Sequence, residues 1–309
     1  MPRHQPEADL PVAERSILIC PASSEKMVAK AAASDADLAV LDLEDAVPPD
    51  LKAASRAAVV SAFRSLDWGA KPRAYRVNAA DTPWCYRDII DVVEACSEQV
   101  GLIIVPKVQD AAQVAFIDHL LSGIEQAVGR RVPIPIDVQI ESARGLANCA
   151  EIAKAAPRIN ALVFGPGDLA ATLGMPLVAI GTPDAWDAAY PGHRFGYAMH
   201  AMLVAARAAG KRVIDGPFAD FRDLEGFRRS AMIARALGYD GKWCIHPSQV
   251  AAATEIFSPT AEEIAEARAV LDAYDAAVQA GAGSLTHAGV MIDAATVRMA
   301  ESVLARAGG

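Results

Sequence analysis

The sequence has few cysteines and no paired pattern among them. There are five in 309 residues, without CxxC spacing, which disfavours a disulfide or zinc framework. We predict reduced thiols, as in a cytoplasm, for the scattered residues Cys20, Cys85, Cys96, Cys149 and Cys244. Long apolar runs are also missing, so we expect no segment that spans a bilayer. Residues 1–14 are polar and lack the apolar region of a signal peptide, which indicates a loose lead-in to a soluble, cytoplasmic protein.

Positive charge is in deficit. The chain has 29 Lys and Arg against 38 Asp and Glu, a formal net charge of −9. This balance disfavours nucleic acid or an anionic membrane as a partner, although it allows a local basic pocket for a phosphorylated ligand. No expected strand is followed by a G-x-G-x-x-G turn or a P-loop, the usual signatures of nucleotide-binding open sheets.

Short β-branched apolar runs alternate with longer segments of helical period. We expect strands at 16–20, 38–44, 73–78, 101–107, 134–141, 161–168, 211–217 and 242–247. The helix-like stretches between them are 24–34, 50–64, 84–98, 110–127, 144–156, 194–209 and 221–237. Eight such units favour a (β/α)8 TIM barrel, and a doubly wound open sheet is the alternative fold.

The composition changes near the C-terminus. The small, turn-forming segment AGAGSLTHAG (280–289) follows a helix-like stretch at 260–279 and precedes an amphipathic helix with Asp293 near its start. We therefore expect a barrel domain over 15–280 and a helical C-terminal extension over 281–309. The extension has three possible roles: docking on its own barrel, acting as a lid, or reaching a neighbouring subunit.

In a TIM barrel, polar residues at the C-terminal ends of strands form the active site. The residues that meet this criterion are Glu44, Asp45, Arg76, Asn78, Lys107, Gln139, Glu141, Asp168, Asp215 and His246. The group is rich in carboxylates and contains no Cys–His or Ser–His–Asp arrangement, so a nucleophile-based mechanism is disfavoured.

Glu141 and Asp168 end adjacent expected strands. Two carboxylates that leave room for water and substrate oxygens are typical of Mg²⁺ sites, and the absence of clustered His and Cys disfavours zinc. The competing interpretation is that each carboxylate caps the helix that follows it. Asp168 lies in the sequence GPGD, where Gly167 would let the backbone approach a ligand closely.

Arg76 lies in a strand otherwise built for burial, so it needs an anionic partner. Its planar fork matches a carboxylate, either of a substrate or of Glu44 or Asp45. Asp42 has the spacing to face the same way, and its role stays open. His246 is either a general acid/base or a turn-shaping residue beside Pro247, and we favour the turn.

The order of several motifs resembles a known family. The motifs are RSILICPAS, LAVLDLEDAVPPDLKAASR, YRVN, IIVPK, QIESARGL, VFGPGDLAA, GKWCIHPSQV and VMIDAATV. From about residue 15 to the C-terminus, the chain resembles the HpcH/HpaI aldolase–citrate lyase superfamily. It is most similar to the citrate lyase β-subunit-like branch, which includes malyl-CoA, β-methylmalyl-CoA and citramalyl-CoA lyases.

This resemblance implies a (β/α)8 barrel that assembles as a homotrimer or hexamer and uses Mg²⁺ or Mn²⁺ without an organic cofactor. In the family pattern, Glu141 and Asp168 ligate the metal, and Glu44 and Asp45 line the site through waters. The pattern also implies that Arg76 grips the carboxylate of a small 2-oxo acid. Asp293 is provided to a neighbouring subunit's site, where we expect it to transfer a proton.

The implied reaction cleaves a 3-hydroxyacyl-CoA, or forms one by a Claisen-type condensation. Malyl-CoA, β-methylmalyl-CoA and citramalyl-CoA are candidate substrates, giving acetyl- or propionyl-CoA with glyoxylate or pyruvate. Lys26 and Lys107, with Arg73, are candidates for contacts to the CoA phosphates. A malyl-CoA thioesterase and a citrate lyase β subunit acting on a carrier-protein thioester are the alternatives. The less typical stretch 173–192 leaves substrate size open.

Overall fold

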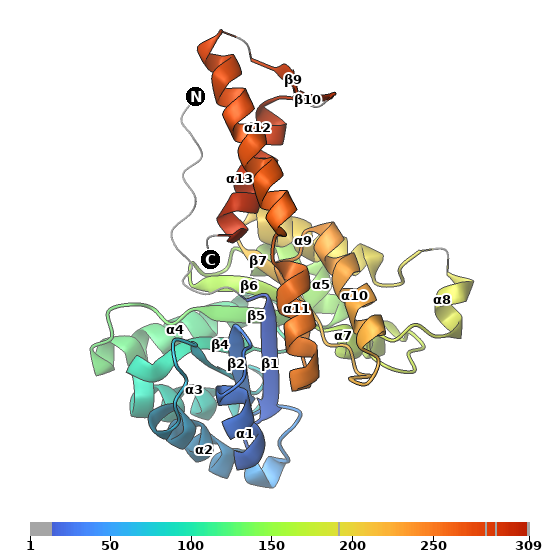
Figure 1. Ribbon diagram of the computed structural model, residues 1–309. Coiled ribbons are helices and arrows are strands. Elements are labelled where there is room, and N and C mark those ends of the chain that lie inside the picture. Colours follow the sequence, from blue (N-terminus) through green and yellow to red (C-terminus); the bar gives the residue numbers. More distant parts are fainter. Residues whose placement is uncertain (1–13, 191, 282, 288, 308–309) are drawn as a thin grey trace. The chain divides into compact units, whose positions relative to one another are not determined.

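The computed structural model describes residues 14–190, 192–281, 283–287 and 289–307 (Figure 1). Within them the chain forms two compact units that meet between Thr254 and Glu255. The expected lead-in lies outside the described residues except for Glu14, which is buried.

The first unit is a closed parallel barrel of eight strands in chain order. The strands are β1 (Ser16–Pro21), β2 (Leu38–Asp42), β3 (Arg73–Arg76), β4 (Val100–Val105), β5 (Ile136–Ile140), β6 (Ile159–Phe164), β7 (Arg212–Asp215) and β8 (Gly241–Cys244). Ile17 of β1 pairs with Leu38 on one side and with Trp243 on the other, which closes the sheet. The predicted (β/α)8 barrel is therefore confirmed, and the open doubly wound sheet is excluded.

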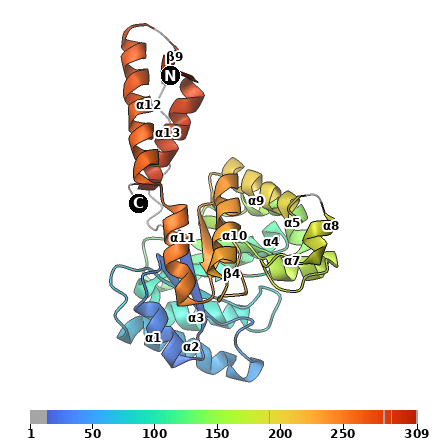
Figure 2. The same cartoon turned by 45° about the vertical axis from the view of Figure 1, so that its right-hand side comes forward.

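Helices cover the outside of the barrel, as both views show (Figures 1 and 2). They are α1 (Glu25–Ala32), α2 (Lys52–Ser65), α3 (Cys85–Cys96), α4 (Ala111–Val128), α5 (Ala143–Ala147), α6 (Cys149–Ile152), α7 (Pro166–Leu173), α8 (Ala185–Ala189), α9 (Gly196–Ala208), α10 (Leu224–Leu237) and α11 (Val250–Phe257). Short 3₁₀ turns occur at 49–51, 97–99 and 247–249. All five cysteines are buried and unpaired, as expected.

The barrel interior is filled by alternate residues of each strand. One buried layer contains Ile17, Leu38, Val40, Ala74, Leu102, Ile104, Ala161, Val163, Ile214 and Trp243. Because side chains alternate with a period of two, the residues that follow Val40 and Ala74 on this face are Asp42 and Arg76. Strands that pack the apolar interior thus place polar side chains at the C-terminal end of the barrel, which we call the mouth.

The structure departs from the expected helices in two places. The helix expected at 144–156 is broken into α5 and α6, and the stretch before α9 forms a long excursion at 175–195 that includes α8. Arg194 ties the excursion together, because its Nε and Nη2 donate to Asp187 at 2.9 and 3.0 Å while Nη2 lies 3.1 Å from Asp184. Asp184 caps α8 by accepting a hydrogen bond from Trp186 N.

The second unit is a helical hairpin with a small antiparallel sheet. It contains α12 (Ala261–Gln279), β9 (Leu285–His287), β10 (Val290–Ile292) and α13 (Ala294–Ala307). Thr260 and Glu263 form a capping box at the start of α12. Ala267 and Val270 of α12 pack with Ile292 and Ala300, so α12 shares its core with α13. Among the described residues, no helix combines the length and apolar character needed to cross a membrane.

Candidate active site

A cavity of about 450 Å³ lies at the mouth of the barrel. Its polar lining comes from the ends of different strands and from the first turn of α7: Asp42, Asp45, Arg76, Gln139, Glu141 and Asp168. The structure therefore brings most of the predicted site residues together. Convergence at this end follows from the parallel barrel, in which all strands end on the same side.

Arg76 is held by Asp42. Its Nε and Nη2 donate to the two Asp42 carboxylate oxygens at 2.7 and 2.8 Å, which is the bidentate geometry. The third nitrogen, Nη1, lies 3.0 Å from Glu44 Oε2 and donates to Gln139 at 3.4 Å. Burial alone would lower the pKa of Arg76, but the Asp42 and Glu44 carboxylates raise it above its ordinary value.

Asp42 is therefore the main partner of Arg76, a role that the sequence left open. Of the two pairings considered for Arg76, the one with Glu44 forms, whereas Asp45 pairs with Lys107 instead. Asp42 also accepts hydrogen bonds from Glu44 N and Ala46 N, so it shapes the turn that presents the acidic pair. The signal that could have revealed Asp42 is its spacing of two from Glu44, which places both on one strand face.

Lys107 links the acidic side chains of the mouth. Its Nζ donates to Glu44 Oε1 at 2.5 Å and to both oxygens of Asp45 at 3.0 Å, and its backbone N donates to Glu141 Oε1 at 2.8 Å. Its φ of 52° is the only positive value of a non-glycine residue in the described part of the chain. Such backbone strain is typically held in place by surrounding contacts at functional sites.

These contacts shift the protonation equilibria in opposite directions. Burial raises the pKa of Glu44 above its ordinary value, against the pull of Arg76 and Lys107. Burial also opposes ionisation of Asp45, yet the Lys107 hydrogen bond holds its pKa below the ordinary value. The sequence assigned Lys107 to CoA phosphates, but here its ammonium is engaged by carboxylates.

Glu141 does not cap a helix. The N-cap of α5 is Ser142, whose Oγ accepts a hydrogen bond from Gly145 N at 3.0 Å. Glu141 is instead 2% exposed, facing the cavity. Burial is the main reason why its pKa is raised to about 8, and the nearby charges of Glu44 and Asp168 add to it.

Asp168 lies in the first turn of α7, next to Gly165, which is the N-cap. Within the described ranges, no hydrogen bond or ion pair engages its carboxylate. It therefore faces the mouth cavity beside Glu141 without a protein partner.

The glycines of GPGD are required by close packing. A Cβ on Gly165 would lie 2.3 Å from Glu141 Cβ, so the side chain of Glu141 uses the space that Gly165 leaves empty. A Cβ on Gly167 would lie 2.8 Å from Cδ1 of Ile180, on the excursion. Gly165 and Ile180 were not predicted, because neither contact joins residues that are neighbours in sequence.

The donor set fits a divalent cation with oxygen ligands. Glu141 and Asp168 are adjacent carboxylates, and the negative charge that raises the pKa of Glu141 is charge that a cation would neutralise. The described residues contain no group of three or more His, Cys, Asp or Glu placed to hold a metal ion. A cation would therefore take its other ligands from water or substrate oxygens, as Mg²⁺ commonly does.

Other predicted residues lie apart from the cavity. Lys26 is exposed on α1 and is not among the cavity's lining residues, whereas the adjacent Met27 is. Arg73 begins β3, at the strand end opposite Arg76. His246 follows the turn interpretation, because its Nδ1 accepts a hydrogen bond from Ser248 N and its ring stacks on Phe221 at 4.7 Å.

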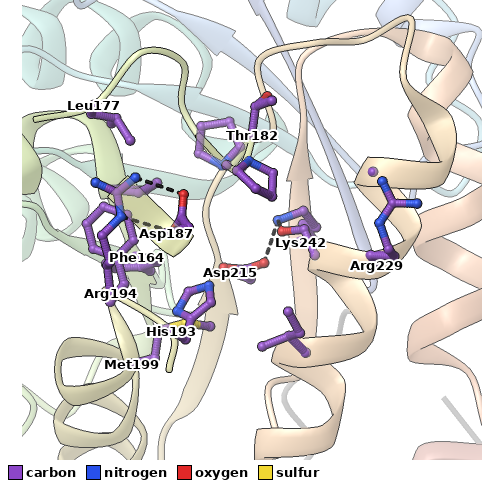
Figure 3. A pocket seen from close by; sticks show the side chains of 18 of the residues that line it. Phe164, Leu177, Thr182, Asp187, His193, Arg194, Met199, Asp215, Arg229 and Lys242 are labelled. Atoms are coloured by element: carbon purple, nitrogen blue, oxygen red, sulfur yellow. Dashed lines mark hydrogen bonds and ion pairs between the residues drawn. The ribbon is translucent and has the colours of Figure 1, made fainter. Parts of the chain in front are cut away.

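Asn78 and Asp215 have structural partners. The amide of Asn78 donates to Leu43 O and to Asp88. Asp215 faces a second cavity of about 280 Å³, lined by β6, β7, β8, α9 and α10 (Figure 3). There its carboxylate bonds the buried ammonium of Lys242, which also donates to Gly216 O at 2.8 Å.

Asp293 lies in the second unit, directly before α13. Its Oδ1 accepts hydrogen bonds from Ala295 N at 2.8 Å and Thr296 N at 3.1 Å. The bond from Thr296, followed by that from Ala295, lowers the pKa of Asp293 below its ordinary value. Asp293 is thus an ionised, accessible carboxylate, and its assignment to a neighbouring site stays a prediction.

The chain is similar to several known proteins. Residues 15–247 match the HpcH/HpaI aldolase/citrate lyase family. The L-malyl-CoA/beta-methylmalyl-CoA lyase of Cereibacter sphaeroides is 42% identical over 299 residues, which cover 95% of this chain and 94% of that protein. The (3S)-malyl-CoA thioesterase of the same species is 35% identical over 298 residues, with the same coverage of 95% and 94%.

A solved structure extends the likeness to three dimensions. The protein CitE from Mycobacterium tuberculosis, crystallised with magnesium, acetoacetate and coenzyme A, aligns with a TM-score of 0.74 and 33% identity. The alignment covers 96% of this chain and 99% of that one. The chain therefore belongs to the HpcH/HpaI aldolase/citrate lyase family.

Proposed function

We propose that the protein is a Mg²⁺- or Mn²⁺-dependent carbon–carbon lyase that acts on a 3-hydroxyacyl-CoA thioester. The substrates we propose are malyl-CoA and β-methylmalyl-CoA, cleaved to acetyl- or propionyl-CoA and glyoxylate, with citramalyl-CoA giving pyruvate. The observation that carries the proposal is the pair of carboxylates, Glu141 and Asp168, which face a common cavity beside the Arg76 guanidinium. The 42% identical relative named as a lyase for these two malyl thioesters supports the substrate class.

Glu141 and Asp168 would hold the cation. When bound, a divalent cation supplies Lewis acidity and a template for the hydroxyl and carboxylate oxygens of the substrate. Lys107 fixes Glu141 through its backbone N–H, and Gly165 leaves the space that the Glu141 side chain occupies. These residues prepare the geometry before the substrate arrives, which lowers the entropic part of the barrier.

Arg76 orients the small acid. Asp42 accepts hydrogen bonds from Nε and Nη2. Nη1 is therefore the nitrogen that can exchange its contacts with Glu44 and Gln139 for a hydrogen bond to a substrate carboxylate. Because the fork is already locked by Asp42, little side-chain entropy is lost when the acid binds. In the cleavage direction, the hydroxyl gives its proton to solvent, its oxygen becomes the carbonyl oxygen of the 2-oxo acid, and the bond to the thioester's α-carbon breaks. The electron pair of that bond then forms a thioester enolate.

Proton transfer at carbon belongs to Asp293 of a second copy of this chain in a homotrimer or hexamer. In condensation, its carboxylate removes a proton from the α-carbon of the acyl thioester, and in cleavage the resulting carboxyl returns a proton there. The two backbone amides that donate to Asp293 fix the orientation of its carboxylate. Loss of lyase turnover in Asp293→Asn, restored in mixed oligomers with Glu141→Gln, would support a site shared between copies.

The test of the reaction is to incubate malyl-CoA with the protein and Mg²⁺ and to assay glyoxylate and free malate together. We expect glyoxylate and acetyl-CoA in equal amounts, and no turnover when Mg²⁺ is removed with a chelator. Malate without glyoxylate would replace the lyase by a thioesterase, the function that the 35% identical relative is named for. No turnover of any free CoA thioester, but turnover of a carrier-protein thioester, would favour a citrate lyase β subunit.

A further inference from the structure

One side chain of the excursion enters the mouth cavity. Residues 175–195 carry many side chains, but among the described residues of this segment Ile180 alone lines the mouth. Others, such as Leu177, Thr182 and Pro183, line the second cavity behind it (Figure 3). The excursion therefore lines both cavities, and Ile180 is its residue in the cavity that holds Glu141 and Asp168.

The backbone at Ile180 is fixed by contacts with the loop after β7. The carbonyl of Ile180 accepts a hydrogen bond from Ala219 N at 2.8 Å. Gly181 follows with a φ of +77°, and a Cβ there would lie 2.9 Å from the Phe218 ring. Because only glycine combines this φ with such close packing, the position at which the chain delivers Ile180 is well defined.

The side chain of Ile180 covers the first turn of α7, which carries Asp168. Its Cδ1 lies over Gly167, where a Cβ would come within 2.8 Å. Ile180 is half-buried and β-branched, and branching at Cβ restricts its χ1 rotamers. It therefore forms an apolar wall beside Asp168, on the excursion's side of a cavity that is also lined by Ile19, Met27, Trp243 and Ile245.

We infer that Ile180 determines which alkyl substituents the reacting carbons of the substrate can carry. This inference rests on the proposed function, since the candidate substrates differ only by methyl groups. The extra methyl lies on the acyl thioester in β-methylmalyl-CoA and on the 2-oxo acid in citramalyl-CoA. In both cases an apolar wall of fixed position accepts or rejects one methyl group, and such a wall discriminates by roughly 10- to 200-fold.

The experiment measures kcat/KM of the wild type, Ile180→Ala and Ile180→Val with malyl-CoA, β-methylmalyl-CoA and citramalyl-CoA. The matched control is Val204→Ala, which shortens a β-branched side chain of α9 that is 67% exposed and lines neither cavity. We expect Ile180→Ala to raise the ratio of methylated to unmethylated substrate by roughly 10-fold. Ile180→Val should shift it in the same direction by less, and Val204→Ala should leave it within 2-fold.

The two methylated substrates show whether Ile180 contacts the methyl group of the acyl thioester or that of the 2-oxo acid. A rise with β-methylmalyl-CoA alone places Ile180 against the acyl α-carbon, and a rise with citramalyl-CoA alone places it against the oxo acid. Ratios within 2-fold of wild type for both Ile180 variants, or an equal rise in Val204→Ala, overturn the inference. If the wild type hydrolyses the thioesters instead, the lyase proposal fails, but the same ratio, read as released CoA, still decides the role of Ile180.

Discussion

Carboxylates gather at both ends of the barrel, in different settings. At the mouth, Glu141 and Asp168 face a cavity of about 450 Å³. At the opposite end, which we call the floor, Glu14 and Asp137 meet at the starts of β5 and β6 around the amide of Asn160. That amide donates to Glu14 at 3.1 Å and to Asp137 at 2.8 Å, and Arg212 donates to Asn160 at 3.0 Å.

The mouth and the floor differ in the groups that surround their carboxylates. Asp137 is fully buried, and both burial and the Glu14 charge raise its pKa well above the ordinary value, which favours a proton on this carboxyl group. Asp168 at the mouth has open space beside it and no protein partner within the described residues. Buried acidity alone is therefore no sign of a metal site. Carboxylates that face a cavity and remain uncommitted are the informative feature.

The largest expected effect on activity comes from substituting the two proposed cation ligands at the mouth. Glu141→Gln and Asp168→Asn each remove a charged ligand for the cation while preserving shape. We expect kcat/KM for malyl-CoA to fall on the order of 10³-fold, because several kcal/mol of charge stabilisation is lost. The control Glu151→Gln alters an exposed carboxylate of α6 and should leave kcat/KM unchanged. Activity within 5-fold of wild type in both site variants would contradict the assignment.

The next effect disturbs the mouth through packing alone. Gly165→Ala places a Cβ 2.3 Å from Glu141 Cβ, which forces the carboxylate out of position. We expect kcat/KM to fall about 10²-fold, the scale of a misplacement by roughly 1 Å. Gly123→Ala on α4 is the control, because a Cβ there meets nothing within 4 Å. It should retain full activity and be as stable as the wild type or more stable, as measured by thermal unfolding.

A smaller effect comes from the arginine fork. Arg76→Lys keeps the charge but loses the bidentate contact to Asp42 and the separate nitrogen for the substrate acid. Loss of one charged hydrogen bond predicts a fall in kcat/KM of roughly 10- to 100-fold. Initial-rate kinetics at varied malyl-CoA concentration measure it. Arg87→Lys, on an exposed part of α3, should change nothing, and equal kinetics for both variants would remove Arg76 from the site.

The smallest expected effect is on the pH dependence of stability, and it comes from a substitution at the floor. A raised pKa of Asp137 means that the native state holds more protons than the unfolded state. Stability is then full below about pH 4, the ordinary Asp range, and falls as pH rises through the folded-state pKa. Asp137→Asn removes this titration, so its free energy of unfolding should fall less than that of the wild type between pH 5 and 8.

Urea unfolding at the two pH values measures that difference. Lyase activity should be unaffected, because the floor contributes nothing to the mouth cavity. Asp272→Asn, at an exposed position of α12, serves as the control for removal of a surface charge. A wild type and an Asp137→Asn variant with parallel pH profiles would show that the floor carboxylates do not share a proton.

The sequence predicted the mouth far better than the floor. Parallel strands deliver their last residues to one end, so Glu141, Asp168 and Arg76 could be grouped from strand ends alone. The floor was missed because Glu14 was assigned to the lead-in and Asp137 sits inside an apolar run. The role of Asp42 as the partner of Arg76 was left open, and the wall formed by Ile180 was missed. The contact between Arg76 and Asp42 joins residues 34 positions apart in the sequence. Ile180 lies on an excursion whose path no local pattern specifies.

Isothermal titration with Mg²⁺ tests the central claim most directly, since it reads the cation site without any substrate. Wild type and Asp137→Asn should bind Mg²⁺ with the same affinity, and Glu141→Gln and Asp168→Asn should bind it at least 10-fold more weakly. Thermal unfolding of each variant confirms that it is folded. Unchanged Mg²⁺ affinity in folded Glu141→Gln and Asp168→Asn would contradict the assignment of the cation to the mouth.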